Sequence, residues 1–154
     1  MNLTHLHLMI NHAPIMGSYL LFLGFGYAVF MKKEHLLRPL MWFYVFTAAA
    51  TVVVYRTGDP AAEEMKKLPG MSAELIQNHE DVAFIALLLI LALGIASFIG
   101  IRYFKKEMPV PAWFKYGFLV IAFVSVVTIS AAAQIGGNIR HPESQNSFNA
   151  ENYK

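Results

Sequence analysis

The chain contains no cysteine among its 154 residues. This absence excludes disulfide bonds, thiolate metal ligands, cysteine-ligated iron–sulfur clusters and covalently attached c-type haem. Charged residues are also scarce: they make up 14% of the chain, whereas a typical soluble domain has about 25%. The middles of the long apolar runs lack Asp, Glu, Lys and Arg, which argues against a coupled carrier, because carriers usually place ionisable residues there.

Enzymatic chemistry has no specific support, since the sequence shows neither a nucleophile–base pair nor a phosphate-binding loop. The net charge of +2 does not indicate a nucleic-acid partner. An electron-transfer or accessory subunit is therefore a better expectation than a stand-alone enzyme.

The sequence is rich in apolar residues, at 56%, and these form runs long enough to cross a bilayer as helices of about 20 residues. We predict an all-α polytopic membrane protein with four transmembrane helices in an up-down-up-down bundle. The predicted spans are 14–31, 39–55, 80–102 and 113–135, which together form a transmembrane domain over 1–141, followed by a polar disordered tail over 142–154.

Helix boundaries are predicted from proline, glycine and capping residues. Pro14 is expected to start the first regular helix, because proline suits the first helical turn. Gly58 is expected to follow the end of the second span, with a turn at Pro60 and a short surface helix over 61–67. Ser72 is predicted to be the N-cap of the helix that enters the third span.

The basic residues predict the orientation. Seven of the twelve lysine and arginine residues lie in the two connections 1–2 and 3–4, and the other five are spread over longer segments. By the positive-inside rule those two connections are cytoplasmic. Both termini and the loop over 59–78 then face outward, which in a bacterial inner membrane is the periplasm.

Histidines gather on the predicted outer face. Five of the six histidines fall there, and His35 alone lies on the cytoplasmic side. His12, His79 and His141 each occupy the outer end of a different span, and the spans that carry His12 and His79 lie diagonally in a four-helix bundle. One face of the third span has small residues below His79, which leave room either for a close neighbouring helix or for a flat cofactor. That face is His79, Ala83, Ala86, Ile90, Gly94 and Ser97.

A haem b group is the first cofactor that this arrangement suggests. Two neutral imidazoles can fill both axial positions of a haem iron and suit it to one-electron transfer. His12 and His79 are the preferred axial pair, with His141 in reserve. Arg56 and Arg140 are placed to meet the anionic propionates near the aqueous edge.

A copper or zinc ion is the alternative, with ligands among His5, His7, His12, His79 and His141. Imidazole suits both metals, and thioether suits reduced copper. If residues 5–16 formed one helix, His5, Met9, His12 and Met16 would share a stripe. Pro14 argues against an uninterrupted helix there, because its ring clashes with the carbonyl group four residues earlier.

Several short motifs resemble those of an uncharacterised bacterial family of four-helix inner-membrane proteins, a domain of unknown function. They are His5, His12-Ala13-Pro14-Ile15, Thr57-Gly58, His79 and Gly136-Gly137-Asn138-Ile139-Arg140-His141. The resemblance covers about residues 5–142. It implies a four-helix inner-membrane protein with a site at these residues and leaves the chemistry of that site open.

Three functions are therefore weighed. The leading hypothesis is a membrane-embedded haem b electron-transfer protein that exchanges electrons with quinol and a periplasmic carrier. The alternatives are a copper- or zinc-binding membrane protein and a non-catalytic packing subunit of a larger complex with other membrane subunits. All three place the chain in the lipid bilayer of the inner membrane.

Overall fold

The computed structural model describes residues 3–67, 72–104 and 109–140, and the side chains of His5 to Ile139 within those ranges. The described chain is helical and contains no strand, so the predicted all-α class is confirmed. The helices are α1 (Leu3–Ile10), α2 (His12–Phe30), α3 (Glu34–Lys66), α4 (Ala73–Tyr103) and α5 (Ala112–Arg140).

Four segments are long enough and apolar enough to cross a membrane, as predicted. They are His5–Phe30, Glu34–Lys66, Ala73–Tyr103 and Ala112–Ile139. Large apolar side chains cover the outside of these helices, for example Leu23, Phe46 and Phe123. Because a water-facing surface rarely carries such a continuous apolar cover, this surface is suited to contact with lipid.

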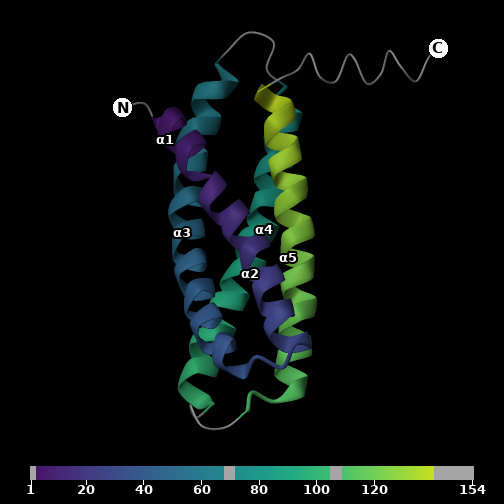
Figure 1. The fold of residues 1–154 in the computed structure, drawn as a ribbon. Coiled ribbons are helices and arrows are strands. Elements are labelled where there is room, and N and C mark those ends of the chain that lie inside the picture. Colours follow the sequence, from purple (N-terminus) through teal and green to yellow (C-terminus); the bar gives the residue numbers. More distant parts are fainter. Residues whose placement is uncertain (1–2, 68–71, 105–108, 141–154) are drawn as a thin grey trace, which may run out of the picture.

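The helices form an antiparallel bundle (Figure 1). α2 packs beside α3 and α5, α4 packs beside the same two helices, and α2 therefore lies diagonally from α4. α1 continues the line of α2 and packs mainly against α3. We call the end with α1 the histidine end, because His5, His7, His12 and His79 lie there, and the opposite end the lysine end, because Lys32, Lys33 and Lys115 lie there.

The predicted boundaries near the ends of α3 and α5 are wrong. α3 does not end before Gly58 and turn at Pro60, but runs unbroken to Lys66 with Pro60 inside it. A proline within a helix removes one backbone hydrogen bond, which this long helix tolerates. The predicted short helix over 61–67 is the last two turns of α3. Similarly, α5 does not end near residue 135 but continues through Gly136 and Gly137 to Arg140.

Of the two predicted helix starts, the N-cap at Ser72 is confirmed and the start at Pro14 is wrong. Ser72 is the N-cap of α4, and its Oγ accepts a hydrogen bond from the Leu75 backbone N–H at 3.2 Å. Pro14 does not start α2, which begins at His12 and includes Pro14 in its first turn. The break between α1 and α2 is limited to Asn11, whose φ of −63° and ψ of −24° are helical.

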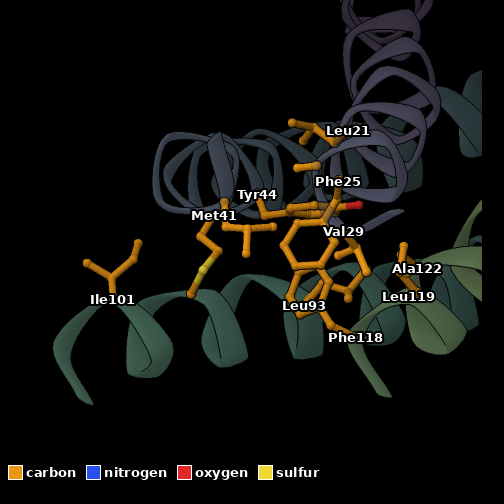
Figure 2. Close-up of a cluster of buried hydrophobic side chains, with 12 residues drawn as sticks. Leu21, Phe25, Val29, Met41, Tyr44, Leu93, Ile101, Phe118, Leu119 and Ala122 are labelled. Atoms are coloured by element: carbon orange, nitrogen blue, oxygen red, sulfur yellow. The ribbon is translucent and has the colours of Figure 1, made fainter. Parts of the chain in front are cut away.

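Aromatic rings fill the lysine half of the core (Figure 2). The Phe25 and Phe118 rings stack with their centroids 4.5 Å apart, and the Tyr44 ring meets Phe118 edge-on at 4.8 Å. Such pairs contribute about 0.5–1.5 kcal/mol each beyond the area they bury. This half of the bundle is therefore tightly filled by large side chains from α2, α3 and α5.

Aliphatic residues form the second buried cluster of the core, nearer the histidine end. It consists of Ala48, Ala86, Ile90 and Ile129 and contains no aromatic ring. Ile76 and Ala132 are also buried. The bundle interior thus changes from aromatic to aliphatic side chains in the direction of the histidines.

Two charged contacts tie the helices together at the lysine end. Arg38 on α3 donates to the Ile101 carbonyl at 2.8 Å and to the Phe104 carbonyl at 3.1 Å, which caps the end of α4. Glu34 forms an ion pair with Lys115 and accepts a hydrogen bond from the Val110 backbone N–H at 3.3 Å. The connections at this end are consequently held by charge-assisted hydrogen bonds.

Candidate functional site

The histidine end brings together stretches that are far apart in the sequence. α1, the last turns of α3, the first turns of α4 and the last turns of α5 all lie there (Figure 1). His7 on α1 contacts α3, and His79 on α4 contacts α5. Among the described residues, His5, His7, His12 and His79 therefore lie at the same end of the bundle as Gly58 and Gly136.

One ring nitrogen of His79 forms a hydrogen bond with α5. Its Nδ1 lies 2.9 Å from the carbonyl oxygen of Ala132 and the ring is partly buried. A carbonyl oxygen can only accept a hydrogen bond, so Nδ1 carries the proton. In the neutral imidazole, Nε2 is then the unprotonated nitrogen and keeps its lone pair.

Gly136 makes room for this ring. A methyl group at Gly136 would lie 3.0 Å from Cε1 and 3.3 Å from Nδ1 of His79, closer than nearly all real contacts of this kind. A methyl group at Gly137, by contrast, would meet no atom within 4 Å. A side chain at the first glycine of the Gly136-Gly137 motif would thus have to displace the His79 ring, whereas one at the second would not.

His7 is fastened to α3 in the same way. Its Nδ1 lies 3.2 Å from the Val54 carbonyl oxygen and 3.1 Å from Thr57 Oγ1. The Thr57 hydroxyl proton is itself donated to the Val54 carbonyl at 2.7 Å, so both neighbours accept from His7 and Nδ1 carries the proton. Gly58 packs beside this ring, where a methyl group would touch Cε1 at 3.6 Å.

The two rings therefore share one chemical arrangement. Each histidine uses Nδ1–H on a main-chain carbonyl of a neighbouring helix and leaves Nε2 as the available nitrogen. His7 is held by α3 and His79 by α5, so the two rings are fixed by different helices at the same end of the bundle. Two imidazoles with fixed orientations are what this end of the bundle offers.

The other predicted site residues either are exposed to solvent or lie at the edge of the described chain. His5 and His12 are exposed on α1 and α2, and Arg56 is exposed on α3. Arg140 is the last residue of α5, and its side chain lies outside the described part of the chain, as does the whole of His141.

His7 is the residue whose importance the sequence reasoning underrated, since it named His7 only as a metal ligand. The signal was present in the spacing of α2. Its buried positions include Pro14, Ser18, Leu21, Phe25 and Ala28, which alternate steps of four and three residues, and Val29 next to the last of them. Continued backwards, this period passes through 11 and 7 and avoids 12.

Among the residues that the structure describes, no three histidine or carboxylate side chains come together as a group that could hold a metal ion. Comparisons of the chain with protein-family models, with curated proteins and with solved structures found no match. The functional argument consequently depends on the two histidines and their surroundings.

Proposed function

We propose that this protein is a haem b electron-transfer protein of the membrane, in which His7 and His79 hold the haem at the histidine end of the bundle. The observation that carries the proposal is the shared state of the two rings, each with Nδ1 on a backbone carbonyl and Nε2 available. Histidines that ligate a metal almost always donate their other N–H to such a partner, which fixes the tautomer and the orientation of the ring.

His7 replaces His12 as the partner of His79 in this proposal. His12 is exposed on α2, whereas His7 is partly buried and oriented by its hydrogen bonds to α3. The predicted pairing of the first and third spans is retained, because α1 extends the span that lies diagonally from α4.

The surroundings of the two rings fit a flat group better than a compact ion. The core on this side of the bundle is built from Ala48, Ala86, Ile90 and Ile129 rather than from aromatic rings. Gly136 and Gly58 bring helix backbone close to the edge of each imidazole. Arg56, which is exposed and precedes Thr57 in α3, provides a positive charge for a propionate at the aqueous edge.

When bound between two imidazoles, haem b supplies one-electron transfer without an open coordination position. The protein would orient the two ligands, keep them neutral and set the dielectric and charge around the group. A site at the membrane edge suits exchange with quinol in the bilayer and with a soluble carrier. The lysine and arginine bias makes that carrier periplasmic in a bacterial inner membrane.

Visible spectra of the purified protein, oxidised and dithionite-reduced, test the proposal in material made in cells supplied with haem. The wild type should show a low-spin spectrum. His7→Ala and His79→Ala should each lose the haem or become high-spin, because an axial position is opened. His35→Ala, at the lysine end, is the matched control and should leave the spectrum unchanged.

Two outcomes would reject the proposal. The first is a wild-type protein without a Soret band. The second is a low-spin spectrum that survives both His7→Ala and His79→Ala. If the wild type were colourless and the two variants only lowered its stability, the histidines would serve to hold neighbouring helices together by hydrogen bonds. That result is expected of a packing subunit. His12→Ala separates the two pairings, since it should affect the spectrum only if His12 is a ligand.

A further inference from the structure

The opposite face of α1 and α2 carries a second set of metal-ligating side chains, away from His7. His5, Met9 and His12 are spaced by four and three residues, and all three are exposed. α1 and α2 are separated only by Asn11, whose backbone is helical, so the three residues follow one another on one side of the segment. Side chains at these spacings have Cβ atoms about 5–6 Å apart.

Met9 is placed like a ligand rather than like a packing residue. It is 69% exposed, and it stands one helical turn from an imidazole on either side. Methionine usually fills gaps in apolar interiors, as Met41 does in this bundle at 2% exposure.

The length of the first span indicates that His5, Met9 and His12 face water or the membrane edge and not the lipid interior. The span His5–Phe30 has 26 residues and is about 39 Å long at about 1.5 Å per residue. The hydrocarbon core is about 30 Å thick, so roughly six residues of the span exceed it. We place this excess at the histidine end, where the polar residues of the span lie. Imidazoles facing hydrocarbon would be costly, which agrees with His5 and Met9 lying outside it and His12 lying at its edge.

We propose that His5, Met9 and His12 form a surface binding site for a soft monovalent metal ion, Cu(I). Neutral imidazole and thioether are ligands that Cu(I) accepts, and a thioether is a poor ligand for Zn²⁺. Met9 is the central residue, because only Met9 is within one turn of both histidines. This site is separate from the pair His7 and His79 and does not depend on haem binding.

Competition for Cu(I) under anaerobic conditions tests the site on the full chain in detergent, with a chromogenic Cu(I) chelator as the competitor. The wild type should withdraw one equivalent of Cu(I). Met9→Leu keeps the size and helical preference of the side chain but removes the sulfur, so it should weaken binding at least tenfold. Met31→Leu, which removes a methionine that is 58% exposed at the lysine end, is the matched control and should bind like the wild type.

The outcome that overturns the proposal is a wild type that takes no Cu(I) from the chelator, or a Met9→Leu variant with wild-type affinity. His12→Ala provides a second measurement and should weaken binding as Met9→Leu does. Since Met9 is exposed, Met9→Leu should leave the helical circular dichroism unchanged, and a loss of affinity then reports on ligation alone.

Discussion

Gly136 and Gly137 offer a comparison in which two neighbouring glycines of one helix should respond oppositely to the same substitution. Glycine inside a helix costs about 1 kcal/mol relative to alanine, so Gly137→Ala, where the methyl group meets no atom within 4 Å, should stabilise the protein by up to about 1 kcal/mol. Gly136→Ala gains the same preference but places a methyl group 3.0 Å from Cε1 of His79.

The cost at Gly136 has two parts. Adding a methyl group to a filled site typically costs about 1–3 kcal/mol. Displacing the ring also removes the bond from His79 Nδ1 to the Ala132 carbonyl, which contributes about 0.5–1.5 kcal/mol. The ring can relieve the contact by giving up the bond, so the two costs do not add in full, and Gly136→Ala should be about 1–3 kcal/mol less stable than Gly137→Ala.

Equilibrium unfolding in mixed micelles, followed by circular dichroism, measures that difference. Nitrogen-15 NMR of the imidazole provides a second measurement, because it reports which ring nitrogen of His79 is protonated. Gly117→Ala, at another open position, is a further control for helical preference. Equal stability of the two neighbouring variants, together with an unchanged His79 tautomer, would show that the ring does not lie against α5.

Two further predictions concern the bundle and its orientation. A methyl group at Gly94 would lie 2.5 Å from the Cβ of Ala48, so Gly94→Ala should destabilise the protein by about 1–3 kcal/mol. Adding Ala48→Gly should recover part of the lost stability. If it recovers none, α3 and α4 do not meet at this position. A reporter that is active only outside the cytoplasm, fused after Lys154, should be active because of the lysine and arginine bias, whereas activity of a cytoplasm-only reporter at that position would reverse the orientation.

Much of the fold could be predicted from the sequence, because apolar runs of this length leave a chain few alternatives in a membrane. The inward face of α4 was also predictable: Ala86, Ile90, Gly94 and Ser97 are buried, and His79 follows from the same spacing. The small residues of this face could accommodate either a close neighbouring helix or a flat cofactor. At Gly94 the structure shows the neighbouring helix, because α3 packs directly against it.

Helix ends were harder to predict, because turn-forming residues outweighed helix continuation in the sequence reasoning. Pro60 and Gly58 favour a turn locally, yet packing of α1 and α4 against α3 keeps the helix intact to Lys66. His12 was preferred because it lies at the outer end of the first predicted span. The helical period places His7 on the inward face, but its contacts with the Val54 carbonyl and the Thr57 hydroxyl of α3 depend on a helix far away in the sequence.

The two ends of the bundle are held by different contacts, and this difference determines where the bundle can open. At the lysine end, ionic contacts and an aromatic core connect α2, α3, α4 and α5, whereas α1 is held mainly against α3 at the other end. Local opening takes place where the least packing is lost. Swinging of α1 away from α3 therefore loses less packing than opening the lysine end, and the aromatic core can stay assembled while the histidine end opens.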